Sequence, residues 1–296
     1  MRNIGAEYFL EKQLVSRAFG TAATNYHRVD QLQQTVAGRL LERLEYTKLR
    51  PALALDLGSG PGTSSARLAR HFKKTVVIET DISCSMLLQS SKRSPRFFSR
   101  RRRFCTDAEN MGLKSSSMDL VFSNLMLQWC DNLDLVFKEV HRVLKPNGLF
   151  IFSSFGPDTL MELRKSWQQV DQYVHVNAFA DMHDVGDALI RAGLENPVME
   201  TENITLNYDD VQNLMRELKR LGAHNVNGGR RKTLTGKRRL QSMLSHYEHW
   251  RSEGKIPATY EVIYGHAWAP ANVKARRIDE QTLAFPLAAL KPVKKQ

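Results

Sequence analysis

Three groups of residues in the first half of the chain have the types and spacing to hold a nucleoside-containing ligand. The first is the segment 55–62, LDLGSGPG, in which Gly58, Gly60 and Gly62 follow Asp56 at the end of an apolar run. Glycine lets the backbone take positive φ angles and approach a ligand closely before the chain enters a helix. The spacing differs from the G-x-G-x-x-G of dinucleotide sites, and it lacks the G-K-S/T of a triphosphate-binding loop. Dinucleotides and nucleoside triphosphates are therefore disfavoured as ligands.

The other two groups contain acidic residues that end or follow later apolar runs. The run 75–82 ends with Glu79, Thr80 and Asp81, where a carboxylate can accept hydrogen bonds from both hydroxyls of a ribose. Asp107 lies in the segment CTDAENMGL, after a third run. Together with the glycine loop, these acids predict a site for an adenosine-containing ligand.

The elements that must position these residues alternate between two patterns. Short apolar or β-branched runs predict strands, and segments with apolar residues at helical spacing separate them. The expected strands are 52–58, 75–82, 103–106, 119–127 and 149–156, and the expected helices are 64–72, 83–93 and 133–148. This alternation predicts an α/β fold with a doubly wound, Rossmann-like sheet, at whose carboxyl edge the loop and the acids would meet.

The rest of the chain extends this scheme at both ends. Residues 27–46 predict an amphipathic helix before the first strand. The second half predicts helices at 158–170 and 181–192, a strand at 197–208, a helical pair at 209–222 and 237–254, and a last strand at 257–269. We expect a seven-stranded sheet whose last strand is antiparallel.

The glycine and acid series resembles the class I S-adenosylmethionine-dependent methyltransferase family over residues 52–156. The family patterns D-x-G-x-G-x-G, D-I-S-x-x-M-L and D-A-E-x-x-x-L are met at 56–62, 81–87 and 107–113. We expect a single methyltransferase domain at 51–269 with a helical insertion at 209–254, preceded by an N-terminal helical lid at 1–50. The tail at 270–296 lacks a sustained pattern and is expected to be flexible.

The same resemblance assigns a role to each part of the cofactor site. The glycine loop would hold the methionine part of S-adenosylmethionine, and Asp81 would bind the ribose. Asp107 with Ala108 would bind the adenine amino edge, and Met86 would pack on the adenine ring. The implied cofactor-binding residues are Asp56, Gly58, Ser59, Gly60, Gly62, Asp81, Ile82, Met86, Asp107, Ala108 and Asn124.

A closer resemblance comes from the second half of the chain. The segments 217–240, which contains GAHNVNGG, and 254–268 look like the biotin-synthesis methyltransferases that esterify malonyl-acyl-carrier protein. The segment AFGTAATNY at 18–26 fits the same family. The resemblance implies O-methylation of the free carboxylate of a malonyl thioester, giving the ester that starts pimelate synthesis for biotin. A carboxylate is ionised at neutral pH, so the reaction needs no catalytic base.

The end of the fourth expected strand indicates which kind of atom accepts the methyl group. Nitrogen-methylating enzymes of this fold typically have an acidic or Asn-Pro-Pro-aromatic tetrapeptide there, whereas this chain has Ser-Asn-Leu-Met at 123–126. Methylation of exocyclic base nitrogens is therefore disfavoured. The residues expected to line the acceptor pocket are Tyr26, Asn124, Gln128, Trp129 and Arg164.

The net charge of +12 is concentrated in two segments. Residues 92–103 contain seven bases and no acid, and residues 216–239 contain nine bases and one acid. Local basicity favours a surface for an acidic macromolecule, which the resemblance identifies as acyl-carrier protein. We expect docking at Arg230, Arg231, Lys237, Arg238 and Arg239, whereas the segment 92–103 is left as a solvated loop or a second contact with that partner.

Composition excludes several other classes of protein. Cys84, Cys105 and Cys130 are odd in number and lack metal-ligand spacing, so neither a disulfide framework nor a metal site is expected. No apolar run is long enough to cross a membrane, and the N-terminus lacks the apolar core of a signal peptide, which predicts a cytoplasmic protein.

Three alternatives remain open at this stage. A basic surface also suits an RNA methyltransferase, although no RNA-binding module is present and nucleic acid is disfavoured. A small-molecule methyltransferase of the quinone type would make the basic segments incidental. A cofactor-binding assembly factor could use the same fold without transferring methyl groups.

Overall fold

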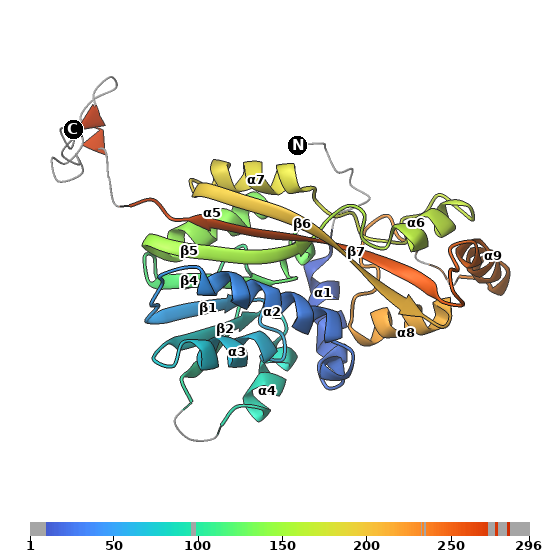
Figure 1. The fold of residues 1–296 in the computed structure, drawn as a ribbon, viewed down its shortest axis with the longest axis horizontal. Helices are drawn as coiled ribbons and strands as arrows, with labels where there is room; N and C mark the ends of the chain where they lie inside the picture. Colours follow the sequence, from blue (N-terminus) through green and yellow to red (C-terminus); the bar gives the residue numbers. More distant parts are fainter. Residues whose placement is uncertain are drawn as a thin grey trace.

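A computed structural model describes residues 10–95, 99–231, 233 and 235–271, together with the short strands β8 (Arg276–Arg277) and β9 (Leu283–Ala284). Its centre is a seven-stranded sheet in the order β3-β2-β1-β4-β5-β7-β6 (Figure 1). The strands are β1 (Leu53–Leu57), β2 (Val76–Asp81), β3 (Arg101–Cys105), β4 (Met118–Asn124), β5 (Leu144–Phe155), β6 (Glu195–Tyr208) and β7 (Ile256–Trp268). β7 is antiparallel to both of its neighbours, and β1 to β5 are parallel. The predicted doubly wound sheet with an antiparallel last strand is confirmed.

Helices cover both faces of this sheet. They are α1 (Lys12–Ala22), α2 (Gln31–Glu45), α3 (Thr63–His71), α4 (Cys84–Lys92), α5 (Leu133–Val143), α6 (Met161–Gln168), α7 (Met182–Arg191), α8 (Val211–Arg220) and α9 (Lys237–Glu248), with short 3-10 turns η2 (Tyr26–Arg28) and η3 (Leu127–Trp129). One apolar core packs α2, α3, α6, α8 and α9, and the other packs α5 and α7. Helical spacing explains this division, since Val36, Leu40 and Leu44 of α2 repeat every four residues and are fully buried.

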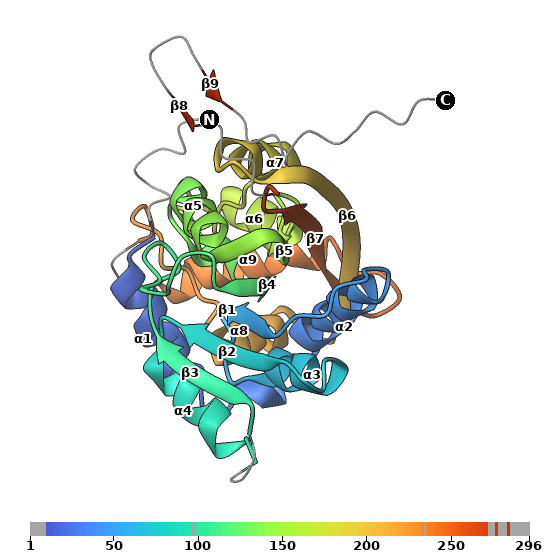
Figure 2. The same cartoon turned by 90° about the vertical axis from the view of Figure 1, so that its left-hand side faces the viewer.

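The predicted helices and strands are present, with two differences that matter. The helix expected over 133–148 ends at Val143, and β5 begins at Leu144 rather than at 149. Pro146 cannot continue a helix, and Asn147 has a φ of +59°. The second difference is α1, an additional helix that packs against α4 (Figure 2).

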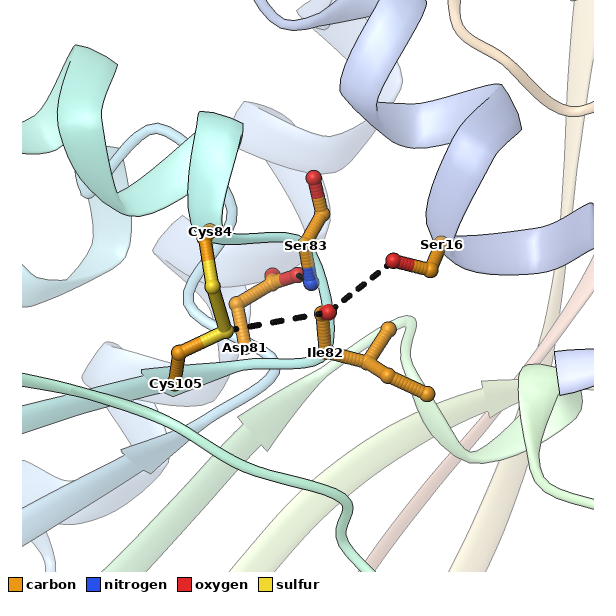
Figure 3. The surroundings of a disulfide bond; sticks show 6 residues. All are labelled: Ser16, Asp81, Ile82, Ser83, Cys84 and Cys105. Atoms are coloured by element: carbon orange, nitrogen blue, oxygen red, sulfur yellow. Dashed lines mark hydrogen bonds between the residues drawn. A yellow bond between two sulfur atoms is a disulfide. The ribbon is translucent and has the colours of Figure 1, made fainter. Parts of the chain in front are cut away.

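One expectation about the cysteines is wrong, because Cys84 and Cys105 form a disulfide (Figure 3). The parallel register of β2 and β3 pairs Asp81 with Cys105, and Cys84 follows Asp81 by three residues at the start of α4. This arrangement brings the two Cα atoms to 5.5 Å, which is a normal spacing for a disulfide. Cys130 is not in a disulfide.

Part of the first basic segment is buried. Arg101 in β3 is 5% exposed and forms an ion pair with Glu79 of β2, which is fully buried. Arg103 lies 3.2 Å from the same carboxylate, and Ser90 of α4 also donates to it. These arginines hold β3, β2 and α4 together, so the interpretation of the segment as a wholly solvated loop is wrong.

Most of the tail expected to be flexible at 270–296 lies outside the described residues. Within the described part of the chain, no helix is long and apolar enough to cross a membrane. Over the same residues, no group of three or more His, Cys, Asp or Glu side chains could hold a metal ion.

Candidate active site

A cavity opens at the carboxyl ends of β1, β2 and β4, where the strand order of the sheet reverses. This is the place where open α/β sheets bind ligands. It encloses about 740 Å³ of empty space, part of it open to solvent. Eight of the predicted cofactor-binding residues line it, namely Gly58, Gly60, Asp81, Ile82, Met86, Asp107, Ala108 and Asn124.

The glycine loop forms one wall of the cavity. Gly58 and Gly60 have φ angles of +75° and +54°. The backbone N–H groups of Gly58 and Ser59 both donate to the Thr80 carbonyl oxygen at 2.9 Å, which ties the loop to the end of β2. A Cβ atom at Gly58 would lie 2.1 Å from Cγ of Met126. The loop therefore requires glycine at 58 for both its backbone conformation and the space available.

Asp81 joins this loop to the start of α4. Its carboxylate accepts hydrogen bonds from the Gly60 N–H at 2.9 Å and the Ser83 N–H at 2.7 Å. Burial raises the pKa of Asp81 to about 6, although the two backbone hydrogen bonds act in the opposite direction. At neutral pH the cavity therefore presents a carboxylate that is held in place by two backbone donors.

Asp107 also lines the cavity, and it forms an ion pair that was not predicted from the sequence. The Lys12 ammonium group of α1 lies 2.6 Å from both the Asp107 and the Glu109 carboxylates. Lys12 is 95 residues from Asp107 in the chain, so no local pattern could have revealed the pair. Phe19 of α1 and Thr106 also line the cavity. The N-terminal helix thus closes over the side that contains Asp107.

Three of the predicted cofactor residues lie outside this cavity. Asp56 is buried, accepts a hydrogen bond from Ser65 and has its pKa raised by burial to about 7. Gly62 begins α3, and a Cβ atom there would meet the Arg101 guanidinium at 2.1 Å. Ser59 lines a smaller adjoining pocket together with Tyr26. Asp56 and Gly62 therefore support the conformation of the glycine loop without lining the cavity.

Three of the residues expected at the acceptor pocket do line the main cavity. Tyr26, Asn124 and Trp129 surround its inner end, beside Leu125 and Met126. The Asn124 amide donates to the Gln33 carbonyl oxygen at 3.0 Å and accepts from the Ser153 hydroxyl at 3.0 Å. The Trp129 ring stands edge-on against Phe19, with 5.0 Å between the ring centroids.

The end of β4 has a strained backbone at this point. Leu125 has a φ of +49°, which is costly for a residue with a Cβ atom. Its N–H donates to the carbonyl and hydroxyl oxygens of Ser153, which hold this conformation. The turn places Leu125 and Met126 in the cavity wall, and the sequence analysis named neither of them as site residues.

The other two expected acceptor residues do not reach this cavity. The Gln128 amide donates to the Leu125 carbonyl oxygen at 2.7 Å, and its side chain is buried below the turn. The Arg164 guanidinium donates to the carbonyl oxygens of Pro157 and Thr159 at 2.6 and 3.0 Å, and it lines a separate pocket beside Trp167. Both side chains therefore support nearby backbone instead.

Known proteins show the same arrangement. Residues 55–152 match the family model of the methyltransferase domain. The malonyl-[acyl-carrier protein] O-methyltransferase of Gallionella capsiferriformans is 47% identical over 270 residues, which cover 90% of this chain and 93% of that protein. The chain belongs to the malonyl-[acyl-carrier protein] O-methyltransferase family. This confirms the resemblance found in the sequence.

Solved structures agree with this membership at the level of the fold. The YcgJ protein from Bacillus subtilis has a TM-score of 0.58 at 15% identity, and the match covers 81% of this chain and 100% of that chain. Phosphoethanolamine N-methyltransferase 2 from Haemonchus contortus, in complex with S-adenosyl-L-methionine, has a TM-score of 0.54 at 17% identity, covering 85% of this chain and 57% of that chain. The family thus shares its sheet and helix arrangement with distant methyltransferases.

In this member of the family, the expected docking residues separate into two places. Arg230 turns toward α1, where it lies 3.2 Å from the Glu11 carboxylate and donates to the Asn227 carbonyl oxygen at 2.7 Å. Arg231 donates to Thr233 and lies over the Tyr173 ring.

The remaining three docking residues, Lys237, Arg238 and Arg239, are exposed in the first turn of α9. Arg239 approaches the Asp171 carboxylate only to 3.9 Å. Within the described residues, Lys237 and Arg238 make no ion pair. The first turn of α9 is therefore the part of the basic segment that is most open to a partner.

A second cavity adjoins the first on the side of the family's helical insertion. It lies between α6, α8 and β7 and encloses about 1330 Å³ of empty space, part of it open to solvent. Leu163, Met215, Leu218 and Tyr260 contribute apolar surface to it. Trp129 lines both cavities, so the two cavities border the same side chain.

Proposed function

We propose that this protein transfers the methyl group of S-adenosylmethionine to the free carboxylate of a malonyl thioester carried by acyl-carrier protein. The observation that carries the proposal is the 47% identity to a malonyl-[acyl-carrier protein] O-methyltransferase over 90% of the chain. That match extends far beyond residues 55–152, which a general methyltransferase domain explains. It therefore includes sequence outside the shared cofactor-binding core.

The residues of the first cavity fit S-adenosylmethionine. Gly60 lines the cavity, and a Cβ atom there would meet no protein atom within 4 Å, so the loop leaves open space that suits the methionine part. The Asp81 carboxylate would accept from the ribose hydroxyls, and Asp107 with Ala108 would bind the adenine amino edge. Met86 is 1% exposed and would pack on the adenine ring. When bound, the cofactor supplies an electrophilic methyl group on a sulfonium.

The protein's part in the reaction is to orient the acceptor and exclude water. An acceptor carboxylate is already ionised at neutral pH, so no side chain needs to remove a proton. Trp129, Leu125 and Met126 give the acceptor end apolar walls, which weaken the hydration of a carboxylate. Burial raises the pKa of Tyr26 above its usual value, so its phenol stays protonated and can donate a hydrogen bond to that carboxylate.

The N-terminal segment 1–50 acts as a lid in this proposal. Lys12 of α1 bridges to Asp107 and Glu109, and the Ser16 hydroxyl donates to the Ile82 carbonyl oxygen at 3.0 Å. Both contacts attach α1 to the wall that would surround the adenosine. Closure of α1 would keep water from the acceptor carboxylate during transfer.

The partner is an acidic acyl-carrier protein that contacts the first turn of α9. Lys237, Arg238 and Arg239 begin this helix, and the turn contains no acidic residue. Cations at a helix N-terminus oppose the helix dipole, at a cost of about 0.3–1 kcal/mol each. A negatively charged partner would relieve this repulsion.

Methyl labelling tests the proposed function directly. Incubation with methyl-labelled S-adenosylmethionine and malonyl-acyl-carrier protein is expected to give a base-labile methyl ester on the acyl group. Acetyl-acyl-carrier protein, which lacks the free carboxylate, serves as the matched control and should stay unlabelled. Labelling of RNA without labelling of malonyl-acyl-carrier protein would contradict the proposal.

Cofactor affinity should depend on pH through Asp81. Its carboxylate is protonated below its pKa of about 6, so its ability to accept from the ribose is present above that pH and lost as the pH falls. We expect the dissociation constant to rise by about tenfold per pH unit below the transition, because one proton is linked to binding. Calorimetric titrations across this range measure it. Asp81→Asn should bind more weakly and with no such dependence, and an unchanged profile in this variant would exclude Asp81 as the cause.

A further inference from the structure

A further pocket lies at the surface between α1 and α8, and arginine and lysine side chains line it. We call it the basic pocket. Arg17 of α1 faces Lys219 and Arg220 at the end of α8, and Arg230 approaches from the following loop. Arg230 is paired with Glu11 at 3.2 Å. Arg17, Lys219 and Arg220 are exposed and make no ion pair with any residue that the structure describes. The pocket therefore carries unneutralised positive charge.

This basic pocket joins the apolar second cavity. Lys219, His224 and Asn225 line both of them. The pKa of His224 lies below its usual value because of desolvation, Lys219 and Arg230, so the ring is neutral at physiological pH and adds no charge to the passage. The second cavity also shares Trp129 with the cofactor cavity. The basic pocket therefore borders the apolar cavity, and the apolar cavity borders the methyl-transfer site.

The order of these three environments matches one kind of ligand. A phosphopantetheine arm has a phosphate at one end, a segment with a geminal dimethyl group and two amides in the middle, and a thioester at the other end. Cations converging on a concave surface suit the phosphate. The apolar walls of the second cavity suit the dimethyl segment.

We propose that the basic pocket binds the phosphate of the phosphopantetheine arm and that the arm enters between α1 and α8. The inference rests on the proposed function, because the carrier-linked malonyl group proposed as the acceptor brings such an arm. It also assigns separate roles to the two parts of the basic segment. Lys219 and Arg220 would read the phosphate, whereas the first turn of α9 would contact the carrier protein.

Binding of two short substrate analogues tests this inference without requiring catalysis. Malonyl-phosphopantetheine and malonyl-pantetheine differ only in the phosphate. Calorimetry on the protein saturated with S-adenosylhomocysteine should show tighter binding of the phosphorylated analogue by about tenfold or more, as expected for charge-assisted hydrogen bonds. The preference should decrease as salt is raised.

Substitutions identify the residues that cause the preference for the phosphorylated analogue. In Lys219→Ala/Arg220→Ala, the two analogues should bind within about twofold of each other, because the two cations assigned to the phosphate are gone. Arg216→Ala is the matched control, since Arg216 is exposed on the same helix, donates to Asn213 and lies outside the pocket. It should keep the wild-type preference. Circular dichroism confirms that each variant is folded, and Lys219→Gln gives a milder second variant.

The outcomes separate this inference from the proposed function. Equal binding of the two analogues by the wild-type protein, no binding of either, or a preference that survives in Lys219→Ala/Arg220→Ala would overturn the phosphate site. Methyl labelling of malonyl-acyl-carrier protein could still succeed in each of these cases. Conversely, malonyl-acyl-carrier protein could stay unlabelled while the protein still prefers the phosphorylated analogue. That result would reject the proposed methyl acceptor and would still support the phosphate site.

Discussion

Replacing Gly58 by alanine is expected to weaken the binding of S-adenosylmethionine by about 100-fold, from the combined cost of a left-handed residue and overpacking. Gly58 has a φ of +75°, and its added Cβ atom would lie 2.1 Å from Cγ and 2.6 Å from Cβ of Met126. Either the loop or the Met126 side chain must shift, and both form the wall of the cofactor cavity. Isothermal titration calorimetry with S-adenosylmethionine measures the loss.

A second glycine in the chain provides the control for this substitution. Gly186 lies within α7, has ordinary helical φ, and a Cβ atom there would meet no atom within 4 Å. Gly186→Ala should keep the wild-type affinity and slightly raise stability, because alanine favours the helix by up to about 1 kcal/mol. If Gly58→Ala bound the cofactor as well as Gly186→Ala does, the glycine loop would not be the cradle for its methionine part.

The largest loss of stability is expected on removing Arg101. Glu79 is fully buried, and Arg101 is the more buried of its two arginine partners, with further bonds to the Ser90 hydroxyl at 2.7 Å and the Gly62 carbonyl oxygen at 3.0 Å. Arg101→Ala leaves the Glu79 carboxylate with only part of its pairing and leaves space beside Gly62. Breaking such a buried pair typically lowers the free energy of unfolding by about 3–5 kcal/mol. Chemical denaturation followed by circular dichroism measures the change.

The neighbouring residue in the same strand is the natural comparison. Arg102 is exposed and donates only to the carbonyl oxygens of Ser99 and Arg101. Arg102→Ala should change the free energy of unfolding by no more than about 0.5 kcal/mol, as is usual for surface substitutions. Replacing both partners, as in Glu79→Gln/Arg101→Met, should recover part of the loss, because no unpaired charge is then buried. Equal losses for Arg101→Ala and Arg102→Ala would show that the ion pair contributes nothing.

Local patterns were enough to predict the architecture and the cofactor wall. Strand and helix periods specify the order of elements, and short right-handed connections leave few arrangements of a parallel sheet. Asp81 ends β2, and Gly58, Gly60 and Asp107 lie within three residues of the end of a strand. Their convergence follows from the topology, because the carboxyl ends of parallel strands share one edge. The helical pair before the last strand was predictable from apolar residues at helical spacing.

Contacts between distant segments were beyond this kind of prediction. Two Cys residues 21 positions apart form a disulfide only because β3 lies beside β2 in a particular register. Arg101 looks like part of a solvated basic segment until that same register buries it against Glu79. Lys12 reaches Asp107 only because α1 folds back over the sheet.

The family, the sheet and the wall that faces the cofactor can all be recognised in the amino-acid sequence, since each depends on spacing along the chain. Which basic residues are structural and which remain available follows from the folded arrangement. Arg101 is buried and Arg230 turns toward α1, whereas Lys219 and Arg220 line a pocket without an ion pair to any residue in the described part of the chain. The physical reason is that the energy of a charge depends on its burial and its partners, and both are set by segments far away in the chain.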